Sequence, residues 1–417
     1  MNRMNVTRHP VIGLVAVRGS TIILQTALAL GMGWLCKPAD FGQFVTVMAY
    51  AMVSTTLCSG GAYQAALRVS HLLTAESVWH GAMIKYLLRS VMRRALLGGA
   101  LTAVLLAANK NVSWSDAAIG AVLTASASFG SIAAGITMAR GDSMRYQVSE
   151  LVIRMPVQIV GVAIALFMDK ATGFTLVLCS VIGSVSSAGF LLALLPINQI
   201  SRPVPQQMAR LVGKFMTSAS INATLFSLFS SCDILLGSRI LSSSEIAPLG
   251  IANRVSSSLA MINGAIFDLQ SSKFALAIRR QQNQEIQRIT RLVSMESALL
   301  TVLTGIVVSS ACVVLYSHLP GTYLAAIWPL TILMVGRLIQ GSLGPGPAVM
   351  TLRGRHIQLG WIVGSAIATE VALIYLLAPV MGTVGLATAS AVGLILYSVA
   401  VRVYIKRMSH GYNRAQS

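Results

Sequence analysis

Four charged residues lie inside long apolar stretches of this sequence: Arg18, Arg254, Arg337 and Glu370. An ionisable side chain inside a membrane span costs about 2.5–3.5 kcal/mol on insertion scales, so each is a candidate for function. Arginine stays charged, and its planar guanidinium binds phosphate oxygens in pairs. These residues therefore predict a cationic substrate-binding cavity formed by the three arginines and suited to a diphosphate. Glu370 is the candidate coupling residue, because it can take up a proton.

A structural interpretation of the same four residues stays open. Arg18 and Arg337 fall nearer the inner face of the membrane, and their long side chains could reach the interface. Arg254 and Glu370 fall at similar depth in the second half of the chain and could form an ion pair. Only their placement relative to a cavity separates these interpretations.

Three asparagines, Asn222, Asn253 and Asn263, lie among many serines and threonines in residues 211–235 and 246–271. Such groups can bind sugar hydroxyls in a wet cavity. They can equally hold neighbouring helices together inside a membrane. The sequence favours neither role over the other.

No pattern in the loops is typical of an enzyme. The five cysteines have neither metal-ligand nor disulfide spacing and are expected to pack as small apolar residues. No loop carries an acidic pair of the kind that glycosyltransferases use, and the longest connections outside the membrane have about ten residues. We therefore expect no catalytic residues, no cofactor and no metal.

The composition identifies a membrane protein. Of 417 residues, 55% are hydrophobic and only 10% are charged. A spanning helix needs about 20 mainly apolar residues. We predict an all-α protein with twelve spans, of which the third is weakened by Arg93 and Arg94: 11–35, 43–67, 90–108, 115–139, 147–168, 173–195, 211–235, 246–271, 293–315, 323–343, 357–377 and 383–403.

The basic residues set the orientation of these spans. The net charge is +19, which in a soluble protein would suggest a nucleic-acid partner. Here 24 Lys and Arg residues fall in alternate segments, 4 in the intervening connections and 3 within spans. Cytoplasmic loops carry this excess. We expect both termini in the cytoplasm, the lipid bilayer as surroundings and no nucleic acid.

An internal repeat divides the chain. Asp40 and Glu245 follow the first and seventh spans, and Arg68 and Lys273 each come 28 residues later. Residues 138–141 (MARG) and 351–354 (TLRG) end the fourth and tenth spans. The order of these landmarks predicts two pseudo-symmetric six-helix lobes, 1–200 and 205–417, joined by a proline-rich linker. Parallel repeats of this kind permit alternating access.

Three short motifs resemble a known family. They are Arg18-Gly19-Ser20 in the first span, Ala39-Asp40-Phe41-Gly42 after it, and Ser59-Gly60-Gly61-Ala62 before Arg68. Their order is similar to the Wzx-type polysaccharide or O-antigen flippases of the multidrug/oligosaccharidyl-lipid/polysaccharide (MOP) exporter superfamily. The second repeat departs from the motif, since Ala247 stands where glycine is usual.

The resemblance implies a function and a location. Such flippases carry undecaprenyl-diphosphate-linked oligosaccharide from the inner to the outer leaflet of the bacterial inner membrane, for polysaccharide biosynthesis, with the polysaccharide polymerase machinery as a further partner. Related flippases of the peptidoglycan precursor have arginines on spans 1 and 8 that face the cavity, the spans of Arg18 and Arg254 here. That precursor flippase has two further C-terminal spans, which argues against the same role for this chain.

Two other classes remain as alternatives. A multidrug or cation antiporter of the same superfamily needs acidic residues within the spans of the first lobe, and the sequence places none there in mid-membrane. A membrane scaffold would not explain buried arginines. The charge of the cavity separates the first alternative from a flippase, because a positive cavity favours a lipid diphosphate and a negative one favours cations.

Overall fold

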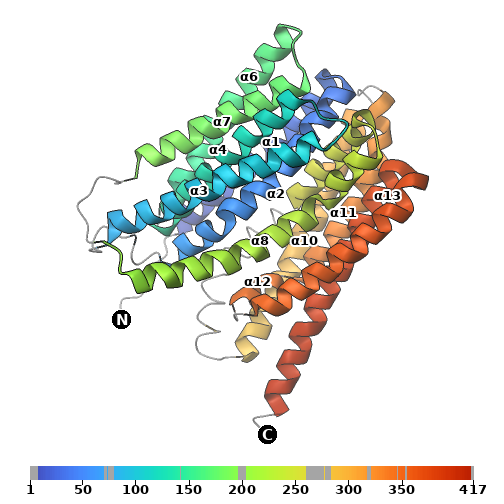
Figure 1. Ribbon diagram of the computed structural model, residues 1–417. Coiled ribbons are helices and arrows are strands. Elements are labelled where there is room, and N and C mark those ends of the chain that lie inside the picture. Colours follow the sequence, from blue (N-terminus) through green and yellow to red (C-terminus); the bar gives the residue numbers. More distant parts are fainter. Residues whose placement is uncertain are drawn as a thin grey trace. The chain divides into compact units, whose positions relative to one another are not determined.

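The computed structural model describes residues 8–69, 73, 79–140, 142–195, 203–259, 277, 283–316, 321–344, 346–352 and 355–414. These residues form helices, turns and connections, and none of them forms a strand (Figure 1). Within the same ranges, nine helices are long and apolar enough to cross a membrane. The prediction of an all-α, multi-pass membrane protein is confirmed.

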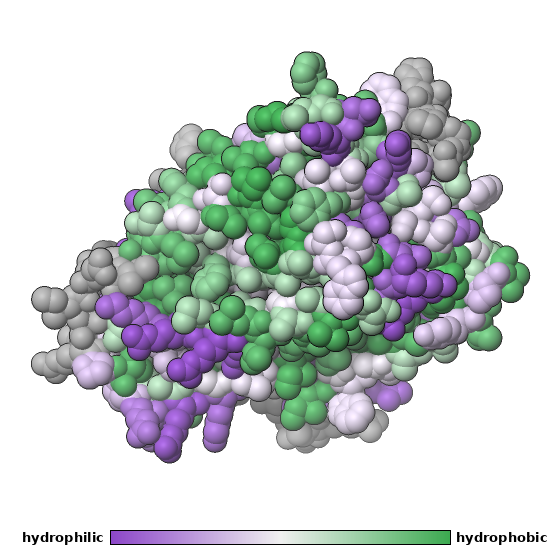
Figure 2. Space-filling view, turned by 45° about the horizontal axis from the view of Figure 1, so that its top comes forward, coloured by the Kyte–Doolittle hydropathy of each residue, from purple (hydrophilic) through white to green (hydrophobic). Residues whose placement is uncertain are grey.

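The last of the nine helical segments contains two predicted spans. Helix α13, His356–Arg414, contains Gly382 with φ 59° and ψ −133°, a conformation that only glycine adopts without strain. The kink separates the predicted spans 357–377 and 383–403. Large apolar side chains such as Leu96 and Val104 are exposed, as lipid-facing residues are, and hydrophobic residues cover much of the face in Figure 2.

The chain divides into two compact units. Unit 1 is Met1–Ser231 with Ser242–Ser244, and unit 2 is Cys232–Leu241 with Glu245–Ser417. The division falls inside helix α8, Gln206–Ile240, so this helix contributes to both units. The lobe boundary at residues 200–205 stays a prediction.

Unit 1 is built around one central helix. Helix α4, Trp114–Ala139, packs against α2 (Pro38–Arg68), α3 (His80–Ala107) and α7 (Gly173–Ala193). Helix α1, Arg8–Leu35, contacts α2, α5 and α6 at the edge of this set. The Ser113–Asp116 capping box starts α4, because each side chain binds the other residue's backbone N–H.

Helix α3 begins ten residues before the predicted third span. Its first three turns carry Met83, Ile84, Leu87 and Val91, all fully buried in one apolar cluster of unit 1. This packing keeps the segment helical although Arg93 and Arg94 lower its hydropathy. Both arginines therefore lie well inside a spanning helix, 13 and 14 residues after its first residue.

A π-helical turn interrupts the next span. Segment η2, Ser149–Arg154, lies between α5 (Ser143–Val148) and α6 (Met155–Phe167). Pro156 follows it and has no N–H to donate to the preceding turn. Such wide turns occur as short insertions in α-helices.

Unit 2 contains the end of α8, most of a helix over residues 243–259, and four further helical segments besides α13. These are α10 (Asn283–Tyr316), η3 (Gly321–Ala326), α11 (Ile327–Leu343) and α12 (Gly346–Leu352). Helix α11 packs against α10 and α13, and α12 packs against α13. Part of the predicted span 246–271 lies outside the described residues.

Candidate functional site

A set of charged side chains lies in the interior of unit 2. It comprises Asp233 near the end of α8, Arg337 on α11 and Glu370 on α13. The two carboxylate residues are 2% and 1% exposed. The positive charge of Arg337 acts on both carboxylates through space, without an ion pair within 4 Å among the described residues, and its guanidinium donates to Gln340 Oε1 at 3.1 Å. We call Asp233, Arg337 and Glu370 the buried charge cluster.

Hydrogen bonds hold both carboxylates in place. Asn253 Nδ2 donates to Asp233 Oδ2 at 2.7 Å, and the Ile234 N–H donates to Oδ1 at 2.8 Å. Ser390 Oγ donates to Glu370 Oε1 at 2.6 Å. The other oxygen, Glu370 Oε2, is buried and has no hydrogen-bond partner among the described residues. It is therefore free to carry a proton.

Close packing of α11 on α13 brings the arginine to this place. A Cβ added at Gly336 would lie 3.2 Å from both Cα and Cβ of Ala391, so the helices approach to backbone contact there. Arg337 and Ser390 are the chain neighbours of these two residues. The absence of a side chain at Gly336 thus lets α11 and α13 bring Arg337 and Ser390 into the same region of unit 2.

The structure brings three predicted residues together and adds one that the sequence reasoning missed. Arg337, Glu370 and Asn253 all lie in or beside the buried charge cluster. The count of three arginines against one glutamate is incomplete, because it omits Asp233. The signal was present, since Asp233 stands in the apolar run of predicted span 211–235. With both carboxylates ionised, the cluster has a net charge of one negative, so Arg337 contributes no surplus positive charge.

The other predicted residues are placed elsewhere or lie outside what the structure describes. Arg254 is exposed on the helix over 243–259. Asn222 lies on the part of α8 that belongs to unit 1, where its Nδ2 donates to Ser218 O at 3.4 Å. Arg18 lies on α1, but its side chain falls outside the described part, as does Asn263 altogether. Their roles in substrate binding stay predictions.

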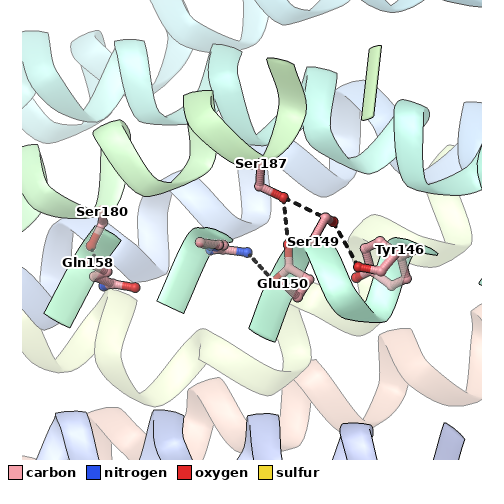
Figure 3. A network of polar contacts seen from close by, with 7 residues as sticks. Tyr146, Ser149, Glu150, Gln158, Ser180 and Ser187 are labelled. Carbon is pink, nitrogen blue, oxygen red and sulfur yellow. Dashed lines mark hydrogen bonds and ion pairs between the residues drawn. The ribbon is translucent and has the colours of Figure 1, made fainter. Parts of the chain in front are cut away.

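A second polar network, in unit 1, joins η2 and α6 to α7 (Figure 3). Arg154 Nη1 pairs with Glu150 Oε2 at 3.0 Å, and Ser187 Oγ lies 3.4 Å from Glu150 Oε1 and from Ser149 Oγ. The Ser149 hydroxyl donates to Tyr146 O at 2.8 Å. Because Arg154, about one helical turn away, compensates the charge of Glu150, this network holds η2 and α6 against α7 and leaves no unpaired carboxylate.

The remaining described acidic residues of unit 1 lie at helix ends. Asp40 accepts from the Gly173 N–H at 3.1 Å, at the start of α7. Asp116 belongs to the capping box of α4, and Asp142 pairs with Arg145 at 3.4 Å. Asp169 follows α6. Within the described part of this unit, no carboxylate stands alone inside a span, and no cluster of metal-binding residues is found anywhere in the described ranges.

Solved structures with the same fold are transporters. The chain is similar to the inward-facing conformation of a multidrug resistance MATE family transporter of the MOP superfamily, at 13% identity and a TM-score of 0.65 over 98% of this chain and 100% of that one. It is similar to the lipid II flippase MurJ in an inward closed conformation, at 11% identity and a TM-score of 0.71 over 95% of this chain and 87% of that one. For the MATE multidrug transporter DinF-BH, the identity is 14% and the TM-score is 0.68, over 96% and 94% of the two chains.

No family model matches the chain, and no curated protein sequence matches it. The protein is a multi-pass membrane protein with the two-lobed helical fold of MOP-superfamily transporters. At this level of identity the likeness concerns the fold, which hosts substrates of different chemistry. The substrate must therefore be argued from the side chains.

Proposed function

We propose that this protein is a flippase. It translocates undecaprenyl-diphosphate-linked oligosaccharide from the inner to the outer leaflet of the bacterial inner membrane by alternating access, with both termini in the cytoplasm. The fold supports a transporter, and one of the similar structures is described as a lipid II flippase. The proposed partner is a polysaccharide polymerase that uses the translocated product.

The charges inside unit 1 carry this proposal. Its described acidic residues lie at helix ends or pair with arginine, whereas Arg94 lies 14 residues into the spanning helix α3. A site for a cationic drug or ion needs an uncompensated carboxylate inside the membrane. A diphosphate needs the opposite sign, since moving a bare anion into a low-dielectric interior is prohibitive. The described interior of unit 1 therefore favours an anionic substrate.

The buried charge cluster of unit 2 suits a coupling role within this function. Glu370 has one oxygen without a hydrogen-bond partner and a compensating arginine nearby, so both its charged and its neutral form can be accommodated. Asp233 is fully hydrogen-bonded and stays as the fixed counter-charge of Arg337. We propose that Glu370 takes up and releases the coupling proton.

The same cluster supports the second candidate, a multidrug or cation antiporter driven by protons. Two carboxylates in the interior of one unit are what proton exchange requires. The two candidates differ in cargo, and a transport assay distinguishes them. An antiporter would accumulate a cationic dye such as ethidium in response to a pH gradient.

Sealed proteoliposomes test the proposal directly. We expect uptake of a short-chain prenyl-diphosphate disaccharide to be faster than in protein-free vesicles, and ethidium to be left untransported. Ethidium accumulation without uptake of the lipid-linked disaccharide would replace the flippase with the antiporter. Reporter fusions after Asn111 and Asp169 should read outside and a fusion after Arg407 inside; an inside signal at Asn111 would contradict the orientation.

A further inference from the structure

Arg94 occupies an unusual position on α3. It lies 14 residues after the first residue of the helix, about 21 Å along its axis. Its neighbour Arg93 is exposed on a different side of the helix, whereas Arg94 is half-buried against α8. No carboxylate of the described residues pairs with it. A guanidinium inside a span without a carboxylate partner among the described residues is a candidate for binding an anion.

The partners of Arg94 are two hydroxyls on α8. Nη1 donates to Ser220 Oγ and Nη2 to Thr217 Oγ1, both at 3.4 Å. Ser220 is held firmly, because the Gly61 N–H donates to the same oxygen at 3.1 Å. A Cβ at Gly61 would overlap the backbone of α8 at Met216, so only glycine permits this approach. The glycine pair of the Ser59–Ala62 motif thus fixes Ser220 beside Arg94.

Hydrogen-bond donors outnumber acceptors around Arg94 and Ser220. A serine hydroxyl has one proton and two acceptor lone pairs. Ser220 is 4% exposed, its Oγ accepts from both Arg94 and Gly61, and within the described part of the chain its proton has no acceptor. Of the five N–H groups of a guanidinium, two are used here. The site therefore presents several converging donors and a full positive charge, but no negative charge.

The surface beside the site is apolar. Leu97 and Leu101 lie three and seven residues after Arg94, so they share its side of α3. They are 73% and 42% exposed. A ligand bound at Arg94 would thus have a hydrocarbon-lined path leading from its anionic group toward the middle of the membrane.

We propose that Arg94 and Ser220 bind the diphosphate of a prenyl-linked substrate, with the prenyl chain lying along Leu97 and Leu101. Thr217 positions the guanidinium, since its own proton is used on Gly213 O at 3.1 Å. The inference rests on the proposed function and names the residues that bind the substrate. The planar guanidinium can bind two phosphate oxygens at once, and the Ser220 proton a third.

Binding to the purified full-length protein in phosphatidylcholine nanodiscs tests this site. The probe is radiolabelled geranylgeranyl diphosphate, which carries no sugar. We expect Arg94→Gln to weaken binding about tenfold or more, because a charge-assisted hydrogen bond is lost. Arg93→Gln removes the same charge from the adjacent, exposed position and should bind as the wild type does. Equal weakening by both variants, or by neither, would overturn the proposal.

Arg94→Lys is a more conservative variant, less disruptive to folding than Arg94→Gln, since lysine keeps the positive charge and loses only the planar pair of N–H donors. We expect it to bind with intermediate affinity; affinity equal to that of the wild type would overturn the bidentate grip. Inorganic pyrophosphate should compete with the probe and geranylgeraniol should not. If phosphatidylglycerol in the nanodisc displaces the probe, the site binds phospholipid headgroups and the assignment to a prenyl diphosphate is wrong.

The test of the Arg94 site can fail or succeed independently of the test of the proposed function. The binding measurement needs no transport, so a site that binds the probe in a protein that moves no lipid-linked sugar would refute the flippase and keep the site. Conversely, transport of the prenyl-diphosphate disaccharide at the wild-type rate by Arg94→Gln would refute the site and keep the flippase.

Discussion

Replacing Arg337 with methionine would leave two buried carboxylates without their positive partner. Methionine has a similar length and fills the space between α11 and α13, so the change removes charge with little loss of volume. Asp233 and Glu370 are 2% and 1% exposed, so solvent has little access to the space that the guanidinium would leave. We expect Arg337→Met to destabilise the protein strongly.

The size of the effect follows from this burial. Removing one partner of a buried ion pair costs about 3–5 kcal/mol, because the remaining charge is left uncompensated. Unit 2 has roughly the size for which 1 kcal/mol shifts a thermal midpoint by about 2–4 °C. Together these values predict a midpoint roughly 6–20 °C lower than that of the wild type.

Thermal unfolding in detergent, followed by tryptophan fluorescence, measures this midpoint. Arg407→Gln, an exposed arginine on α13, is the matched control and should leave it unchanged. Adding Glu370→Gln to Arg337→Met should recover part of the loss, since it removes one of the two carboxylates. If Arg337→Met unfolds at the wild-type temperature, or if the second substitution lowers the midpoint further, Arg337 is not the counter-charge of these residues.

Three further predictions give independent checks. Glu370→Gln alone should keep the thermal midpoint, because the amide oxygen still accepts from Ser390, while transport loses its dependence on a pH gradient; retained dependence would exclude Glu370 as the proton site. Gly61→Ala should lower the free energy of unfolding by about 1–3 kcal/mol, because the added methyl group overlaps α8. Gly189→Ala is the control: its methyl group meets no atom within 4 Å and should stabilise α7 by roughly 0.5–1 kcal/mol. Equal thermal midpoints for the two variants would refute the close packing at Gly61. Burial, with the nearby Asp40 carboxylate, raises the pKa of the Cys36 thiol to about 11. Since the thiolate is the nucleophile, the rate of maleimide labelling of Cys36, measured by mass spectrometry, should still increase above pH 9. A rate that is constant from pH 9 upward would contradict the raised pKa.

Much of the fold could be predicted because a membrane span needs one local property, an apolar run of sufficient length. The two spans within α13 were separable in the sequence, since Pro379 and Gly382 lie between them, where the helix kinks. The start of α3 was predicted ten residues late because Lys85 and Arg89 lower the hydropathy of the residues before 90. The buried contacts of Met83 to Val91, which extend the helix, depend on the rest of unit 1.

The site was only partly predictable for a related reason. Each charge inside a span is visible by itself, and Arg337 and Glu370 were found that way. Which charges compensate one another depends on helix packing, and neither the link from Asp233 to Asn253 nor the approach of Gly336 to Ala391 has a local signature. Arg94 lies near the start of the predicted span 90–108, but its hydroxyl partners on α8 became apparent only in the structure.

The two sets of interior charges respond differently to the membrane potential, and this links the proposals. A prenyl diphosphate joined to a sugar carries two negative charges, so its complex with Arg94 has a net charge of one negative. An inside-negative potential favours outward movement of that complex by about 2.3 kcal/mol per charge per 100 mV. After release, Arg94 is left with one positive charge, whose return toward the cytoplasm the same potential also favours. Arg337 gives no such drive, because Asp233 lies beside it as a counter-charge, and proton uptake at Glu370, as proposed above, would add to a cycle that the potential alone already directs outward.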